Sequence, residues 1–133
     1  MQIIKGRKVI GGKAKGEALV TSEPICFLGG IDVKTGQVTE IGHPLYGKSI
    51  AGKILVFPTG KGSTGGSYLI YEATSNGVGA AAMINYNVEQ VTAIGCIMAE
   101  IPLIDQPELD PIKLIKDGDL VEVDADAGTI TIL

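Results

Sequence analysis

The chain has 133 residues and 13.8 kDa, with 45% hydrophobic and 20% charged residues, which fits one domain and excludes a disordered chain. The net charge is −4 and Trp is absent, so neither a basic face nor a set of stacking aromatics is offered to a nucleic acid. No apolar run approaches the roughly 20 residues of a membrane span. Residues 1–12 lack the apolar core of a signal peptide, so we expect a cytoplasmic protein with no membrane partner.

The first third of the chain is typical of β-structure with turns. Residues 17–21 predict a strand, and residues 36–41 predict a second short extended piece. Between them, residues 27–36 carry a Gly-Gly pair and a Thr-Gly, which indicate a structured loop.

The middle of the chain predicts a βαβ unit. Residues 53–57 and 80–84 are continuous apolar runs, the pattern of strands buried on both faces. A Gly-rich loop over 58–66 follows the first of them, and residues 67–74 then predict a short helix. Strand, helix and strand at this spacing indicate two neighbouring parallel strands.

The last third returns to strands. Residues 94–104 form an apolar run that Glu100 and Pro102 interrupt. A charge at the edge of a strand explains Glu100 as well as a role in a site does. Residues 112–115 predict one helical turn, and residues 120–124 and 129–132 alternate in period two and predict a hairpin. The fold class is therefore α/β, rich in strands and with short helices, over a single domain 1–133.

Two cysteines are too few for a metal centre. Cys26 and Cys96 lie far apart in apolar neighbourhoods and form no Cys-x-x-Cys pair, whereas zinc and iron–sulfur sites take three or four protein ligands. We expect two reduced cysteines and no metal in this chain. A metal used by this protein would have to come from a partner.

The Gly-rich loop favours an anion. A loop between a buried strand and a helix start concentrates backbone N–H groups at the positive end of the helix dipole. The alternative is a sharp connection that needs several glycines for its geometry alone. A nucleotide-binding P-loop does not fit, because Gly66 stands where that motif requires its lysine.

Nucleophile patterns do not decide the chemistry. Ser63 lacks the Gly-x-Ser-x-Gly elbow of a serine hydrolase, and His43, the only histidine, has no triad spacing to it. His43 is then either a solvated or hydrogen-bonded loop residue or a supporting member of a site. From these patterns alone the chain is an α/β domain with an anion-binding loop.

Five sequence blocks together resemble the swivelling domain of the aconitase X family. They occur in the family's order and span nearly the whole chain: Gly-Gly-Ile-Asp at 29–32 with Thr-Gly at 35–36, His-Pro-Leu-Tyr-Gly at 43–47, Ile-Leu-Val-Phe-Pro through Gly-Lys-Gly-Ser at 54–63, Ala-Glu-Ile-Pro at 99–102, and Gly-Asp-Leu-Val-Glu-Val-Asp at 118–124.

The resemblance implies a three-layer β/β/α swivelling domain and a hydro-lyase. It implies that the chain is the smaller partner of a large catalytic subunit, which holds a [4Fe–4S] cluster through its own cysteines. A free-standing chain of this length implies dehydration of a phosphorylated hydroxy acid, (R)-5-phosphomevalonate, to trans-anhydromevalonate 5-phosphate in the mevalonate route to isoprenoids. Hydroxyproline dehydratases belong to the same family, so the substrate rests on this free-standing architecture.

The family's catalytic serine falls on Ser63, which the resemblance makes the proton acceptor. An alkoxide at Ser63 needs convergent donors, and the N–H groups of Gly62, Thr64 and Gly65 are the candidates that bind the substrate or this anion. Gly66 is a further donor, and Lys61 is the adjacent cation. The turn at 29–32 either lines the site or serves only as a turn.

Two other functions compete with this interpretation. Phosphohistidine-carrying mobile domains share a similar architecture, and His43 would then carry the phosphoryl group. A non-catalytic subunit that only caps a related hydroxy-acid dehydratase would need no serine at position 63.

Overall fold

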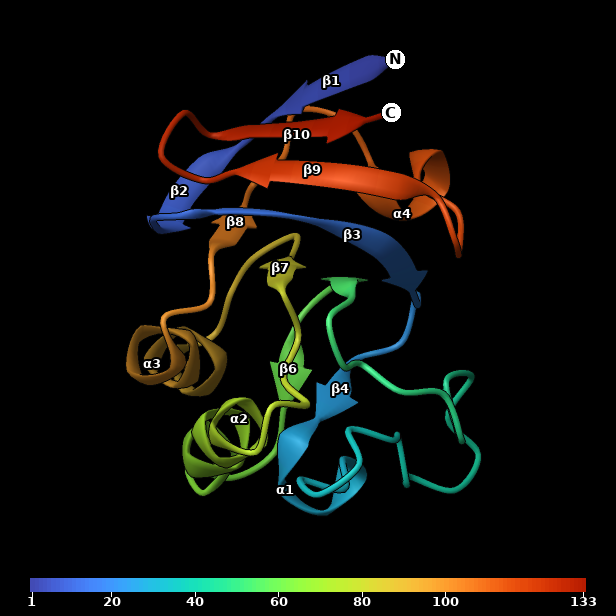
Figure 1. Cartoon of the computed structure of the whole chain (residues 1–133), viewed down its shortest axis with the longest axis vertical. Helices are drawn as coiled ribbons and strands as arrows, with labels where there is room; N and C mark the ends of the chain where they lie inside the picture. The colour runs from blue at the N-terminus through green and yellow to red at the C-terminus, as the bar shows by residue number, and fades with distance from the viewer.

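The computed structural model describes residues 1–133 and stacks two β-layers on one layer of helices (Figure 1). The strands are β1 (Gln2–Lys5), β2 (Arg7–Ile10), β3 (Lys13–Val20), β4 (Ile25–Cys26), β5 (Ile54–Val56), β6 (Gly60–Lys61), β7 (Ala82–Ile84), β8 (Leu103–Asp105), β9 (Leu120–Asp124) and β10 (Thr129–Ile132). The helices are α1 (Phe27–Gly30), α2 (Gly66–Ser75), α3 (Gln90–Ala99) and α4 (Pro111–Leu114). The fold expected from the sequence is confirmed.

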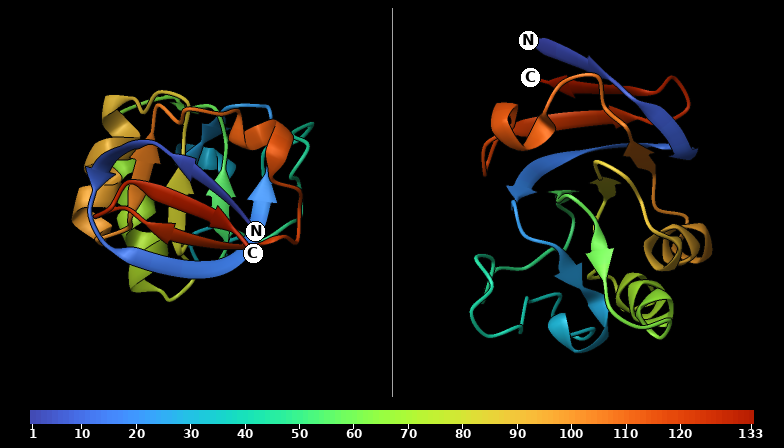
Figure 2. Two further views of the ribbon diagram at one scale, coloured as in Figure 1. Left: turned by 90° about the horizontal axis from the view of Figure 1, so that it is seen from above. Right: turned by 180° about the vertical axis from the view of Figure 1, so that it is seen from behind.

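One eight-stranded sheet supplies both β-layers. Its order is β1-β10-β9-β3-β5-β7-β8-β2, with β4 and β6 forming a separate parallel pair. β1 and β2 are joined through Gly6 yet lie at opposite ends of this order, so the sheet folds back on itself. β3 makes the corner, because residues 13–17 pair antiparallel with β9 and residues 18–20 pair parallel with β5. Both chain ends lie on the β1/β10 side (Figure 2).

Two crossovers place both long helices in one layer. β5, α2 and β7 form the predicted βαβ unit, and β7, α3 and β8 repeat it. α2 and α3 lie together beneath the parallel strands, on the side away from β1, β9 and β10 (Figure 1).

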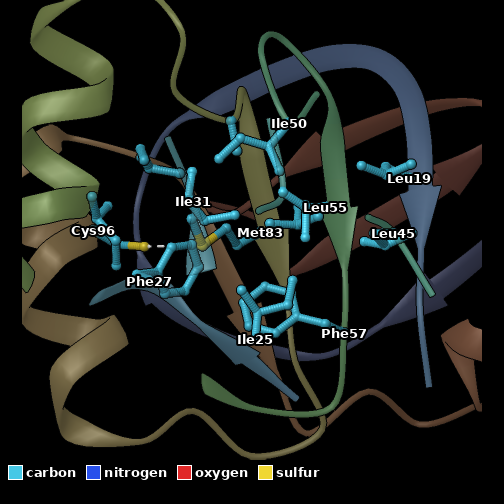
Figure 3. Packing of buried hydrophobic residues seen from close by; sticks show 14 of the residues in the cluster. Leu19, Ile25, Phe27, Ile31, Leu45, Ile50, Leu55, Phe57, Met83 and Cys96 are labelled. Atoms are coloured by element: carbon cyan, nitrogen blue, oxygen red, sulfur yellow. Dashed lines mark hydrogen bonds between the residues drawn. The ribbon is translucent and has the colours of Figure 1, made fainter. Parts of the chain in front are cut away.

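Side-chain alternation along the parallel strands builds two cores. In β5 and just beyond it, Leu55 and Phe57 point to the core under the helices, whereas Ile54 and Val56 point to the core between the β-layers. All four side chains are fully buried, because they alternate between the two faces of the strand and both faces are covered. The Phe57 ring meets the ring of Phe27 edge-on, with centroids 6.0 Å apart (Figure 3).

Two local predictions need correction, and one apolar run divides between two elements. The segment 36–41 forms only isolated bridges, Gln37 with Ser49 and Val38 with Ile31, because no full strand lies alongside it. The run 94–104 divides into the end of α3 and the strand β8. Glu100 is the left-handed residue that ends α3, with φ 57°, and is therefore not an edge-strand charge.

No helix of the structure is both long and apolar enough to cross a membrane.

Candidate active-site loop

Ser63 lies on an exposed loop between β6 and α2. The loop has no side-chain cap for the helix, and the backbone N–H groups of residues 62–65 donate to no acceptor within the chain. The first N–H group used internally is that of Gly66, which donates to the Ser63 carbonyl at 3.0 Å. The loop that carries Ser63 therefore has four free N–H donors, at residues 62–65 and next to the positive end of α2, an arrangement that suits an anion.

The loop is held from one side by the segment that follows β3. β4 pairs in parallel with β6, which brings Cys26 beneath the loop. Gly62 has φ +103°, and a Cβ there would lie 2.7 Å from the Cys26 Sγ. A Cβ on Gly65 would lie 3.3 Å from Leu28. Close packing thus requires glycine at position 62, whereas at position 65 a small shift of the exposed Leu28 side chain would admit a Cβ.

We expect Gly62→Ala to displace the loop. Strain at a positive φ together with the Cys26 contact should cost about 1–3 kcal/mol of unfolding free energy. Gly29→Ala is the matched control, because Gly29 has φ +82° but open space around it, so only the left-handed strain of about 1–2 kcal/mol remains. Urea unfolding of both variants measures the difference, and equal losses would contradict the packing argument.

The start of α3 holds the loop from the other side. The Glu89 carboxylate caps α3 by accepting the N–H groups of Val91 and Thr92. A Cβ on Gly60 would lie 2.4 Å from Glu89 Oε1 and 2.3 Å from Thr92 Oγ1. Only glycine fits at position 60, so the helix cap of α3 and the strand leading to Ser63 are built against each other. No local pattern in the sequence indicates this contact.

The Lys61 ammonium group forms an ion pair with a carboxylate. Its Nζ lies 3.2 Å from Glu40 Oε2, in an ion pair that is partly exposed. Exposed pairs of this kind contribute only about 0–1 kcal/mol. In this arrangement Glu40 already balances the Lys61 charge, so the unpaired donors of the loop are its backbone N–H groups.

His43 is a buried hydrogen-bonding residue of the loop that follows α1. Its Nδ1 accepts the Leu45 N–H at 3.0 Å, and its Nε2 lies 3.0 Å from the Pro24 carbonyl, to which it donates. The ring is thus neutral with the proton on Nε2, and both nitrogens are engaged. A free ring nitrogen, which phosphoryl transfer requires, is not present.

The turn at Gly29, Gly30 and Asp32 is shaped by its own hydrogen bonds. Asp32 Oδ1 accepts the Lys34 N–H at 2.8 Å, and the Asp32 carbonyl accepts the Gly36 N–H at 2.7 Å. Of the two interpretations left open for this block, the contacts of Asp32 favour the turn.

The thiols of this chain do not fit an iron–sulfur cluster. No group of three or more His, Cys, Asp or Glu side chains lies close enough together to hold a metal ion. Cys96 is fully buried and its Sγ lies 3.6 Å from the Met83 Sδ (Figure 3). Burial, and secondly the Glu89 charge, raises the pKa of Cys96 to about 12, so its thiolate is not available as a ligand.

This thiol environment predicts the outcome of a labelling experiment. In the native chain we expect a disulfide reagent such as DTNB to modify Cys26 and to leave Cys96 unmodified until unfolding. Cys26→Ser should abolish the native reaction and keep one reactive thiol in denaturant. Rapid reaction of two thiols in the native chain would contradict the assignment.

Some hollows of the surface lie beside the Ser63 loop, and others lie far from it. A groove of about 240 Å³ runs between α2 and α3 and is lined by Thr64, Ser67, Tyr68, Gln90, Val91, Ile94 and Met98. The largest hollow, about 390 Å³, is lined by residues 86–87 and 106–110 and does not include Ser63. The groove that includes Thr64 therefore adjoins the candidate site, and so does a smaller hollow of about 140 Å³ that is lined by Lys61 together with Glu40 and His43.

Comparison with known proteins identifies the family. The family model described as "Aconitase X swivel domain" matches residues 3–132. The chain belongs to the aconitase X swivel-domain family. A solved structure from this family, the holo form of Thermococcus kodakaraensis aconitase X, superimposes with a TM-score of 0.95 at 47% identity, covering 100% of this chain and 99% of that one.

Curated relatives of this swivel domain carry a more specific name. A protein of Methanocella arvoryzae called phosphomevalonate dehydratase small subunit is 54% identical over 96% of both chains. A protein of Thermococcus kodakarensis with the same name is 48% identical over 98% of this chain and 96% of its own. The resemblance on which the family prediction rested is thereby confirmed.

Proposed function

We propose that this chain is the small subunit of a two-subunit hydro-lyase that dehydrates (R)-5-phosphomevalonate to trans-anhydromevalonate 5-phosphate. Near-full-length similarity to relatives named phosphomevalonate dehydratase small subunit carries the proposal. The partner is a large subunit, and residues 1–133 act as one swivelling unit beside it.

The reaction removes one water molecule. A proton leaves the carbon next to the carboxylate, a C=C bond forms, and the hydroxyl leaves the neighbouring carbon. We assign the proton to the Ser63 Oγ, in its alkoxide form. Free N–H groups at Gly62, Thr64 and Gly65 lower the free energy of that alkoxide and orient the substrate anion.

The [4Fe–4S] cluster belongs, in this proposal, to the large subunit. When bound there it would supply a Lewis acid for the departing hydroxyl. This chain contributes the proton acceptor and the anion-binding backbone, and because Ser63 is exposed, it is accessible to a partner.

Reconstitution with the large subunit tests the function. The isolated chain should show no turnover, and the heterodimer should convert (R)-5-phosphomevalonate to an alkene product that NMR detects. Mevalonate without its phosphate is the control substrate. An assembled, cluster-loaded heterodimer that leaves phosphomevalonate unchanged would overturn the proposal.

A further inference from the structure

Both ends of the candidate active-site loop lie on the start of α3. At the upstream end, Gly60 packs so closely on Glu89 and Thr92 that no Cβ fits between them. At the downstream end, a Cβ on Gly66 would lie only 3.1 Å from the Val91 Cγ1. One short stretch of chain therefore sets the position of the two ends relative to each other.

Ser67 forms a buried side-chain hydrogen bond at the downstream end. Its Oγ donates to the Val91 carbonyl oxygen at 2.7 Å, and the residue is only 5% exposed. The loop itself is held by few contacts of its own, because the backbone N–H groups of residues 62–65 donate to no acceptor within the chain. The shape of the loop therefore depends on how its ends are held.

Apolar packing alone does not fix the start of α2 on α3. The two helices lie side by side (Figure 1) and approach closely at Gly95, where a Cβ would lie 2.6 Å from the Ile70 Cδ1. Apolar burial depends on the area in contact and has no preferred direction, whereas a hydrogen bond of 2.7 Å requires a defined position of its donor. The Ser67 hydroxyl thus holds the first turn of α2 in one place against α3.

We infer that Ser67 is a positioning residue for the dehydration and acts through Ser63. This inference rests on the proposed function, in which the Ser63 Oγ accepts the proton. Ser67 does not itself reach the substrate, because its hydroxyl is buried and directed to Val91. Without that hydrogen bond the start of α2 is free to shift, and Ser63 shifts with it. A displacement of about 1 Å at reacting groups can cost about 100-fold in rate.

Ser67→Ala tests the positioning role, because it removes only the hydroxyl and leaves a residue that favours helix. We expect kcat of the reconstituted heterodimer to fall about 5- to 50-fold, with KM and the Kd for the large subunit each within about threefold of the natural values. Initial rates at saturating large subunit give kcat and KM, and isothermal titration calorimetry gives Kd. An unchanged kcat would overturn the inference.

The matched control lies at the other end of α2. The Asn76 Nδ2 donates to the Val33 carbonyl oxygen at 2.8 Å, so Asn76→Ala also removes a hydrogen bond from a side chain to the backbone. Both variants should lower Tm by about 2–6 °C, and both should stay folded in an assay at 25 °C. Asn76→Ala should keep kcat within about twofold. An equal fall of kcat in the two variants would show a general loss of stability and overturn the inference.

A double variant tests whether Ser67 acts through Ser63. In the Ser63→Ala background, Ser67→Ala should lower the residual kcat by less than about threefold, because the group that it positions is already gone. A role independent of Ser63 would lower the rate by the same factor in both backgrounds. That result would overturn the inference.

A readout on the isolated chain separates the failure of this inference from that of the proposed reaction. NMR relaxation of the backbone amides should show order parameters at residues 62–65 that fall in Ser67→Ala from the rigid level of about 0.85 toward about 0.6, and that stay unchanged in Asn76→Ala. Unaltered order parameters in Ser67→Ala would overturn the inference, even with normal turnover. A loosened loop, together with a natural heterodimer that leaves phosphomevalonate unchanged, would overturn the proposed reaction and leave the hydrogen bond of Ser67 as the contact that orders the loop.

Discussion

Ser63→Ala should lower kcat of the reconstituted heterodimer about 10²- to 10⁴-fold, the usual loss on removal of a general acid or base. The side chain is exposed on a loop, so its loss leaves no cavity and the free energy of unfolding should be unchanged. Heterodimer affinity should also stay the same. Initial rates with (R)-5-phosphomevalonate, at saturating partner, give the result.

Proton transfer has a signature that a structural role lacks. In D₂O the natural heterodimer should exchange the substrate hydrogen next to the carboxylate, and Ser63→Ala should abolish that exchange. Ser22→Ala, which removes another exposed serine, is the control and should leave both readouts unchanged. Full activity of Ser63→Ala would rule out Ser63 as the proton acceptor and would indicate that this chain is a non-catalytic cap.

Phe57→Ala should cost about 3–5 kcal/mol of unfolding free energy. Phe57 is fully buried in the segment between β5 and β6, and its ring meets that of Phe27, the first residue of α1 (Figure 3). Domains of this size are stable by only about 5–15 kcal/mol, so the variant approaches the unfolding threshold. Urea denaturation measures the loss.

Phe57→Leu is the matched comparison. It keeps an apolar side chain in the same space and should cost about 1–2 kcal/mol, because only part of the cavity opens. A loss below about 1 kcal/mol for Phe57→Ala would show that the core collapses around the missing ring, contrary to the close packing of Phe27 and Phe57.

Local patterns predicted the elements that support the site. Continuous apolar runs identified β5 and β7, the helix α2 follows the Gly-rich loop, and the C-terminal hairpin follows strict alternation. These features depend on residue spacing within about ten positions, which the sequence displays directly. The position of Ser63 just before a helix was therefore predictable, and so was the supply of N–H donors around it.

Contacts between distant segments were not predictable in the same way. Parallel pairing of β4 with β6, the Lys61–Glu40 ion pair and the approach of Glu89 to Gly60 join residues that are 20 to 40 positions apart. No periodicity in the sequence encodes such pairs. They depend on the order of the strands in the sheet and on which strand the start of a helix packs against. Glu100 shows the same limit, since its left-handed backbone becomes evident only where α3 ends against β8.

The sequence by itself determined which chemical groups are present and which family the chain resembles. It places a serine among glycines at the start of a helix, has too few cysteines for a cluster, and contains five blocks typical of one family. Tertiary structure alone decided the environment of each group. It exposed Ser63, buried His43 with both ring nitrogens hydrogen-bonded, and paired Lys61 with Glu40. Exposure and pairing depend on which chain segments the folded sheet brings together, and that order arises only when the whole core forms.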